Sequence, residues 1–343
     1  MKKITIKKIV NIADRMQQKK FNLLLTAKKF DKIQRQVLPR KALFNVSNTC
    51  TSNCVFCAYQ YYRDPVTIMS NDLFGLCCQQ FASLQPNSWV SLTPIIGEPF
   101  TDRGLFKKIE IAKKCKVKRI ETYSNASLLK TYYNEILESP LDEIYISFPD
   151  FNEEEYKIIF RTNLYKISIE GIYELLKKHK KKDSSLLVRL NLRGRKSLSA
   201  INEEPDFIKY VKPFLSNKVT MDVTKKYDNW GGLIKQDDLP IGMQLAKDVK
   251  NENQGVCLRL FKVMFLSNGD VKLCGCRCKE TIFDDLVVGN IYKDSLEAIW
   301  FNEHVYELRN KFFRGEYPDI CVNCTHYKKL SYDYFKNNKK IIS

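Results

Sequence analysis

Short apolar segments alternate with amphipathic segments over residues 42–224, and this alternation limits the possible folds more than any other feature of the chain. Short apolar runs bounded by turn residues are typical of buried strands, and apolar residues spaced three or four apart are typical of helices packed on them. Repeated strand–helix units favour a parallel sheet, because a parallel connection needs a crossover. The sequence therefore predicts an α/β fold, a partial (β/α)6 barrel. The expected strands are Ala42–Ser47, Trp89–Ile95, Val117–Tyr123, Glu143–Phe148, Leu186–Arg193 and Lys218–Val223, and helices are expected at Asn71–Ala82, Asp102–Cys115 and Ile167–His179.

Three of the expected strands carry polar side chains on one face and apolar side chains on the other. Successive side chains of a strand point to opposite faces, so a helix-covered sheet turns its apolar face outwards. The polar face then lines the lumen and predicts a cavity for polar ligands; an open sheet with one wet face is the alternative. The candidate acid–base and orienting groups on this face are Arg189, Asn191, Arg193, Asp222 and Tyr145.

Cys50, Cys54 and Cys57 form a close group directly after the first expected strand, with three and then two residues between them. Three thiolates suit a [4Fe-4S] cluster that keeps one iron without a protein ligand. A closed zinc site requires a fourth nearby Cys or His, and no histidine lies close to this group in the sequence. The spacing therefore favours an iron–sulfur cluster with an open coordination position.

This cysteine spacing, with Phe56 before the last cysteine, resembles the radical S-adenosylmethionine (SAM) superfamily. The segment Ile96-Gly97-Glu98-Pro99 after the second strand is similar to the Gly-Gly-Glu-Pro motif of that family, with Ile96 in place of the first glycine. The resemblance implies that the three cysteines bind the cluster and that SAM chelates its open iron. It implies cofactor-binding positions at Phe56, Gly97, Glu98, Pro99, Ser124, Asn125, Ser147 and Arg161.

The resemblance also implies a reaction. Members of the family reductively cleave SAM to a 5′-deoxyadenosyl radical, which abstracts a hydrogen atom from the substrate. Such cleavage needs a cluster of low potential, so a reduced flavodoxin- or ferredoxin-like electron donor is implied as a partner.

A second cysteine group lies near the C-terminus. Asn268-Gly269 predicts a hairpin turn between Lys262–Leu266 and Val271–Leu273, which brings the following cysteine back towards the preceding one. Four thiolates gathered in this way suit either a cluster or zinc. The arrangement resembles the SPASM domain in its shortened twitch form, as in 2-deoxy-scyllo-inosamine dehydrogenase-like proteins, and implies a second, auxiliary [4Fe-4S] cluster. Its implied ligands are Cys257, Cys274, Cys321 and Cys324, with Cys276 and Cys278 as alternatives to Cys274.

These patterns predict five regions. They are an N-terminal helical extension at 1–40, the radical SAM partial barrel at 41–225, a linker at 226–256, a small α+β SPASM/twitch domain at 257–330 and a basic C-terminal tail at 331–343.

The formal net charge of +18 raises the question of a nucleic-acid partner. The lysines are spread along the whole chain, and the densest run, residues 177–182, lies where a helix is expected to end and cations are favourable. Charge alone therefore does not establish an acidic partner, and we expect nucleic acid to be an unlikely one. No apolar run is long enough to cross a bilayer and no signal peptide is evident, so we expect a cytoplasmic protein without a membrane partner.

We expect a radical SAM oxidoreductase that dehydrogenates a sugar- or aminocyclitol-like substrate. The alternative is an enzyme that matures ribosomally made peptides; the 40 residues before the barrel are short for a leader-binding domain. An alternative of another class is a non-catalytic iron–sulfur or zinc protein, which would need neither an open iron nor a cofactor pocket.

Overall fold

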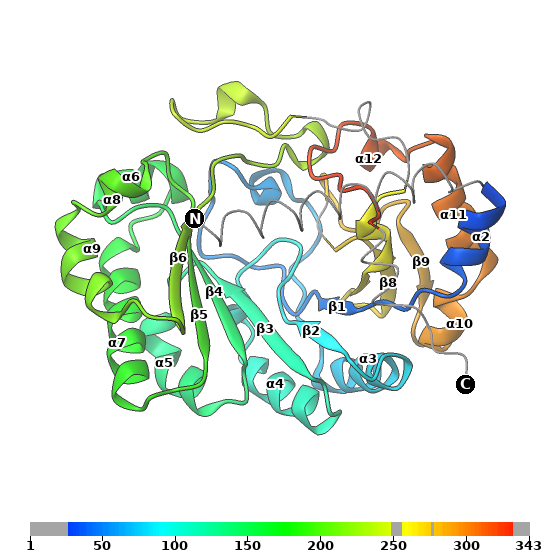
Figure 1. Ribbon diagram of the computed structural model, residues 1–343, viewed down its shortest axis with the longest axis horizontal. Helices are drawn as coiled ribbons and strands as arrows, with labels where there is room; N and C mark the ends of the chain where they lie inside the picture. The colour runs from blue at the N-terminus through cyan, green and yellow to red at the C-terminus, as the bar shows by residue number, and fades with distance from the viewer. Residues whose placement is uncertain (1–26, 248–255, 276–277, 332–343) are drawn as a thin grey trace, which may run out of the picture.

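The computed structural model describes residues 27–247, 256–275 and 278–331, and in this part of the chain nine strands form one mixed sheet (Figure 1). The strand order is β6-β5-β4-β3-β2-β1-β7-β8-β9. Strands β1 to β6 pair in parallel, β7 pairs in parallel with β1, and β8 and β9 continue antiparallel. The strands are β1 Lys41–Phe44, β2 Trp89–Ser91, β3 Arg119–Ser124, β4 Glu143–Phe148, β5 Leu187–Leu192, β6 Val219–Val223, β7 Val263–Phe265, β8 Asp270–Leu273 and β9 Val287–Asn290.

Helices connect the parallel strands and cover the outer face of the curved sheet, as Figure 1 shows for α4, α5 and α7. This arrangement confirms the predicted α/β fold with its partial barrel. The helices are α2 Ala27–Gln34, α3 Asn71–Leu84, α4 Leu105–Lys114, α5 Leu129–Glu138, α6 Glu153–Phe160, α7 Tyr165–Lys181, α8 Leu198–Ile201, α9 Pro205–Tyr210, α10 Leu296–Trp300, α11 Glu303–Arg314 and α12 Asp319–Val322. No helix in the described ranges is both long and apolar enough to cross a membrane.

The two faces of β5 differ as the alternation predicts. Val188, Leu190 and Leu192 are buried, whereas Arg189 and Asn191 between them are partly exposed. The neighbouring strands follow the same register, so polar residues of β4 and β6 stand beside those of β5 on the face turned away from the helices. The sheet therefore presents a polar inner face, with Tyr145 beside Arg189, Ser147 beside Asn191, and Asp222 on the other side of Asn191.

Strand β2 is shorter than the sequence predicts and ends at Ser91 instead of Ile95. Pro94 has no amide hydrogen to donate to a neighbouring strand, so the ladder cannot continue through it. The chain leaves the sheet here, and the amide of Ile95 donates instead to the side-chain oxygen of Asn45 at 3.1 Å. This turn carries the Ile96–Pro99 segment over the carboxyl end of β1.

The SPASM region shares its sheet with the barrel, which the sequence did not reveal. Ala42 of β1 pairs with Val263 of β7, and the predicted hairpin joins β7 to β8 with Gly269 at φ +89°. Pairing with β7 covers the edge that β1 would otherwise expose. Strand β9 was not predicted, and most of the proposed tail and part of the proposed linker and N-terminal extension lie outside the described residues.

Two substitutions on adjacent residues test this assignment of faces. Leu190→Ala removes a fully buried side chain from the helix-covered face, so we expect the free energy of unfolding to fall by about 2–5 kcal/mol. Asn191→Ala on the inner face should lower it by no more than about 1.5 kcal/mol, because only partly exposed hydrogen bonds are lost. Urea titrations of both variants measure the difference, and equal losses would contradict the assignment.

Candidate functional site

Residues 50–57, which we call the cysteine loop, follow β1 and are held by the end of helix α6. The amides of Asn53 and Val55 donate to the carbonyls of Phe160 and Ile159, at 3.1 and 3.0 Å. The last carbonyls of a helix have no partner within the helix, so they can accept these hydrogen bonds. The loop is thus fixed in position although little of it is regular secondary structure.

The thiols of Cys50, Cys54 and Cys57 lie close enough to interact electrostatically. Burial raises the pKa of all three, that of Cys50 to about 12, and the charge of Cys57 raises the pKa of the other two further. Three buried thiolates without a cation are therefore unfavourable, whereas a cationic iron–sulfur core compensates their charge. The donor set fits the predicted cluster.

Gly97 lies where only glycine fits. Its φ is +124°, and an added Cβ would stand 2.7 Å from the carbonyl oxygen of Ser47. The amide of Glu98 donates to the carbonyl of Thr49 at 2.8 Å. The backbone at 97–98 is thereby packed against the chain that enters the cysteine loop. Ile96, which replaces the first glycine of the motif, is buried among apolar side chains.

The buried Glu98 carboxylate ties this segment to the end of β3. It accepts hydrogen bonds from the Ser124 hydroxyl at 2.9 Å and from the Asn125 amide at 2.7 Å. Burial raises the pKa of Glu98 to about 7, against the effect of these donors. Its side chain therefore acts as an internal anchor, and Pro99 after it begins the 3₁₀ turn Pro99–Thr101.

The side chain of Asn125 continues this anchoring into the cysteine loop. Its amide nitrogen lies 2.9 Å from Thr51 Oγ1, 3.2 Å from Ser52 Oγ and 3.6 Å from Cys50 Sγ. On the other side of the loop, Arg161 donates to Gln60 Oε1 at 3.0 Å from a left-handed backbone position. Asn125 thus contacts the cysteine loop directly, and Arg161 reaches it through Gln60, whose side-chain amide donates to the carbonyl of Cys57 at 3.2 Å. Their roles in cofactor binding stay predictions.

At the amino ends of the strands, the inner face is closed by a charged cluster around Glu143. Arg189 donates to Glu143 at 2.9 Å, Arg119 forms a second ion pair with it, and the Tyr145 hydroxyl donates to it at 3.1 Å. Burial raises the pKa of Glu143, but the hydrogen bonds from the two arginines outweigh burial and leave it below its ordinary value. Arg189 and Tyr145 are therefore engaged in this cluster. Sequence reasoning missed Glu143, although it shares the alternation of Tyr145 and Ser147.

At the carboxyl ends of the strands, Arg193 lies beside the cysteine loop. Its guanidinium stands 5.6 Å from the centre of the Phe56 ring and donates to Asn191 Oδ1 at 3.1 Å. The Asn191 amide donates in turn to Asp222 Oδ1 at 2.9 Å. This arrangement places a cation, an amide and a carboxylate in a row whose Arg193 end lies beside the cysteine loop.

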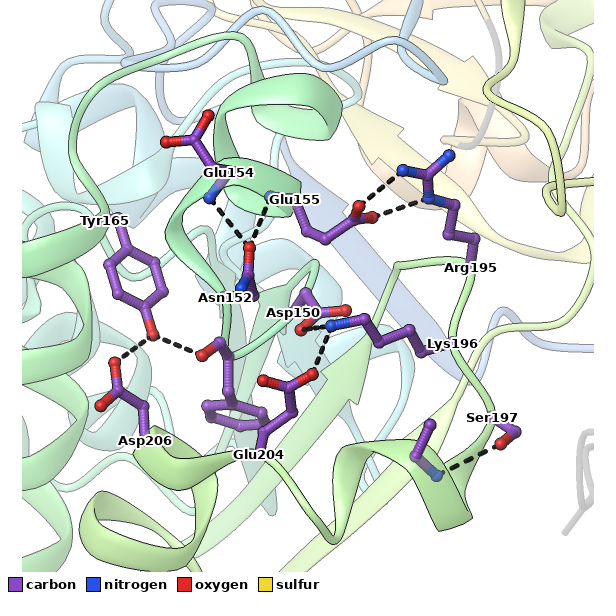
Figure 2. A network of polar contacts seen from close by, with 12 residues as sticks. Asp150, Asn152, Glu154, Glu155, Tyr165, Arg195, Lys196, Ser197, Glu204 and Asp206 are labelled. Atoms are coloured by element: carbon purple, nitrogen blue, oxygen red, sulfur yellow. Dashed lines mark hydrogen bonds and ion pairs between the residues drawn. The ribbon is translucent and has the colours of Figure 1, made fainter.

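A polar network holds the loops that follow β4 and β5, and Figure 2 shows its ion pairs. Arg195 donates to Glu155 at 2.8 Å, and Lys196 lies 3.2 Å from the buried Asp150 and also pairs with Glu204. The network joins helix α6 to the loop after β5. It therefore supports both the helix that anchors the cysteine loop and the position of Arg193.

The second cysteine group converges on one pocket. Empty space of about 350 Å³, partly open to solvent, lies between the 3₁₀ turn Leu258–Phe261, the end of β8 and helix α12. The amide of Leu258 donates to the carbonyl of Lys328 at 2.6 Å, which draws the two ends of the region together. The pocket is lined by Cys257, Cys274, Cys321 and Cys324, together with Arg259, Leu260, Phe312, His326 and Tyr327.

The structure separates Cys274 from one of its two alternatives. Cys278 is fully buried in a small apolar cluster with Leu43, Ala58 and Met264, and it does not line the pocket. Cys276 lies outside the described residues. In the described part of the chain, no three Cys, His, Asp or Glu side chains lie close enough together to hold a single metal ion. A four-iron cluster places one thiolate on each iron, so its ligands need not crowd around one centre as zinc ligands do.

Two family models match the chain. The radical SAM superfamily model matches residues 44–194, and the model of the SPASM iron–sulfur cluster-binding domain matches residues 257–325. The chain belongs to the radical SAM superfamily and carries a C-terminal SPASM domain. This confirms the predicted family, and the two domains imply [4Fe-4S] clusters and SAM as cofactors of this radical SAM enzyme.

Solved structures share the fold at low sequence identity. BtrN in complex with AdoMet and 2-DOIA is 18% identical with a TM-score of 0.56, over 87% of this chain and 99% of that one. SuiB of Streptococcus suis bound to the precursor peptide SuiA is 16% identical with a TM-score of 0.59, and the match covers 82% of this chain and 68% of SuiB. AnSMEcpe with bound AdoMet and the Cp18Cys peptide is 14% identical with a TM-score of 0.53, and the match covers 88% of this chain and 95% of anSMEcpe. A comparison with curated protein sequences finds no match.

We expect Gly97→Ala to disturb the radical SAM site. The left-handed backbone and the clash with Ser47 should lower the free energy of unfolding by about 1–3 kcal/mol and reduce iron bound by the three cysteines. Gly75→Ala is the matched control, because its Cβ meets only Ile111 at 3.7 Å inside helix α3, where alanine stabilises by about 0.5–1 kcal/mol. Urea unfolding and iron analysis of both variants provide the test, and an undisturbed Gly97 variant would contradict it.

Asp150 should give the protein a distinct pH dependence. Burial raises its pKa from 3.8 to about 6, against the attraction of Lys196, so the folded protein keeps this proton to a higher pH than the unfolded chain. The free energy of unfolding should therefore fall as the pH rises between these two values, and Asp150→Asn should remove that slope.

Glu155 provides the opposite control. The hydrogen bond from Arg195 lowers its pKa, outweighing burial, so its stabilising contribution is lost as the pH falls through this lower value. Glu155→Gln should therefore remove a slope of opposite sign. Urea titrations at several pH values measure both variants, and equal slopes in wild type and Asp150→Asn would refute the assignment.

Proposed function

We propose that this radical SAM enzyme dehydrogenates a small, hydroxyl-rich substrate of the sugar or aminocyclitol class. The observation that carries the proposal is the row of Arg193, Asn191 and Asp222 on the inner face beside the cysteine loop. These side chains offer donors and an acceptor suited to hydroxyl or amino groups, and they lie next to the expected source of the radical.

The residues proposed to hold the cofactors follow from their positions. Cys50, Cys54 and Cys57 would hold the first cluster, and the four cysteines of the SPASM pocket would hold the auxiliary one. When bound, SAM and the two clusters supply a radical that removes one hydrogen atom from the substrate and a site that accepts one electron. The cofactor-binding positions proposed from the resemblance are Phe56, Gly97, Glu98, Pro99, Ser124, Asn125, Ser147 and Arg161.

The protein's own residues would orient the substrate and move one proton. Arg193 would position an oxygen of the substrate, because a guanidinium offers several N–H donors and no hydrogen-bond acceptor. Asp222, held by Asn191, is the carboxylate proposed to accept the proton released on oxidation. Burial, followed by the charge of Glu143, raises the pKa of Tyr145 to about 12, so this phenol stays protonated and does not serve as the base.

The alternative substrate is a peptide. It is supported by the fold shared with SuiB, whose structure contains a precursor peptide, and with anSMEcpe, whose structure contains the Cp18Cys peptide. The small-molecule class is preferred because of the row of Arg193, Asn191 and Asp222. Coverage does not separate the two classes, since the match covers 99% of BtrN, crystallised with 2-DOIA, and 95% of anSMEcpe with its peptide. A reduced flavodoxin- or ferredoxin-like donor and a cytoplasmic location, where thiols stay reduced, complete the proposal.

Metal analysis and SAM cleavage test the proposal directly. After anaerobic reconstitution we expect about eight irons with matching sulfide per chain, falling to about four in the Cys50/Cys54/Cys57→Ala variant. The wild type should form 5′-deoxyadenosine from SAM under strong reduction, and that variant should form none.

Two outcomes would contradict parts of the proposal. About four irons with one retained zinc would make the SPASM site structural and remove the electron acceptor. Absence of 5′-deoxyadenosine from fully loaded enzyme, with a panel of sugars, aminocyclitols and peptides present, would support an electron-relay protein instead.

A further inference from the structure

Residues 227–232, which we call the bridge segment, follow β6 and contact the cysteine loop through Tyr227 and Trp230. The indole Nε1 of Trp230 donates to the carbonyl of Phe56 at 2.9 Å, across 174 positions of sequence. The ring of Tyr227 lies at a tilt to the Phe56 ring, with the ring centres 5.1 Å apart, and its hydroxyl donates to the carbonyl of Gly194 at 3.0 Å. Phe56 directly precedes Cys57, so these contacts reach the radical SAM site itself.

Asp228 and Asn229, between these two residues, contact the segment that carries Cys321 and Cys324. The side-chain amide of Asn229 donates to the carbonyl of Asn323 at 2.6 Å, and its backbone amide donates to Thr325 Oγ1 at 3.0 Å. The Thr325 hydroxyl also lies 3.1 Å from Asp228 Oδ1. Asn323 stands between Cys321 and Cys324, so the contacts fall on the backbone that carries two of the four thiols.

The backbone of the bridge segment is strained where it turns between the two sites. Trp230 has φ +51°, an unusual value for a bulky side chain, and Gly231 and Gly232 follow at +68° and +100°. A Cβ at Gly231 would stand 3.0 Å from the carbonyl of Ile320. Strain of this kind persists only where surrounding contacts over-determine it, and Trp230 packs against both the main core and the small apolar cluster around Cys278.

We propose that the bridge segment is a positioning element that fixes the cysteine loop and the SPASM pocket relative to each other. It also provides a bonded connection between them, from Cys57 through Phe56, Trp230, Asn229 and Asn323 to Cys324. Trp230 is the positioning residue for the cysteine loop, and Asn229 is the positioning residue for the segment that carries Cys321 and Cys324. The electronic part of this inference rests on the proposed presence of a cluster at both sites; the mechanical part rests only on the contacts.

Two matched pairs of variants of the reconstituted holoenzyme test the inference. Trp230→Phe keeps an aromatic side chain but loses the indole donor. Trp300→Phe is its control, because the Trp300 indole donates at 2.8 Å to the carbonyl of Val37, which lies outside both cysteine segments. Asn229→Ala removes the contacts with Asn323, and Asn290→Ala is its control in the β9 strand.

Hydrogen exchange gives the first readout. Both bridge variants should raise amide exchange three- to tenfold, roughly the effect of one lost hydrogen bond, within residues 54–62 and 320–326. The control variants should raise exchange only around their own contacts. Unchanged exchange of the two cysteine segments in both bridge variants would overturn the proposal.

Electron paramagnetic resonance of the fully reduced holoenzyme gives the second readout, because the magnetic interaction between two clusters depends on their separation and on the bonds between them. The magnetic interaction between the two reduced clusters should weaken in Trp230→Phe and stay at its wild-type strength in Trp300→Phe, with equal iron content in both. A wild-type interaction in Trp230→Phe would overturn the electronic coupling. A wild type with only one cluster would refute the proposed electron acceptor, and the exchange measurements alone would then decide the mechanical role.

Discussion

The parallel pairing of β1 with β7 is the contact on which both cysteine sites depend. Strand β1 lies between β2 and β7, and its carboxyl end leads directly into the cysteine loop. Strand β7 continues through the hairpin to β8, after which Cys274 enters the SPASM pocket. Because strand pairing fixes the register of every residue, the same ladder that starts the radical SAM site also sets the position of the SPASM site.

The charges of the inner face are divided between its two ends. At the amino ends of the strands, Glu143 and Glu121 pair with Arg119, Arg189 and Lys41. Removing one partner from such a buried group is costly, so these ion pairs close the floor of the barrel as one unit. At the carboxyl ends, Arg193 instead contacts an amide and an aromatic ring, which leaves its charge directed towards the cysteine loop and the space beside it.

Particular residues show how far the sequence could be interpreted. The alternation along β4 and β5 predicted the polar inner face, because side-chain direction in a strand follows from local geometry alone. The same alternation did not separate Arg189 from Arg193, since one belongs to an ion pair with a distant glutamate and the other does not. Likewise, the spacing around Cys274, Cys276 and Cys278 left three choices. The structure places Cys274 at the pocket because the residue after β8 takes a left-handed turn, while Cys278 packs into an apolar cluster.

By itself, the sequence determined the strand–helix pattern, the three-cysteine spacing and the hairpin at Asn268-Gly269, because each follows from residue preferences over a few positions. Only the tertiary structure decided that β7 completes the barrel sheet, that helix α6 holds the cysteine loop and that Trp230 and Asn229 join the two sites. These contacts link residues that are far apart in the sequence; Ala42 and Val263, for example, are paired across more than two hundred positions. Such pairings are selected by burial and backbone hydrogen bonding over the whole fold, which no local pattern records.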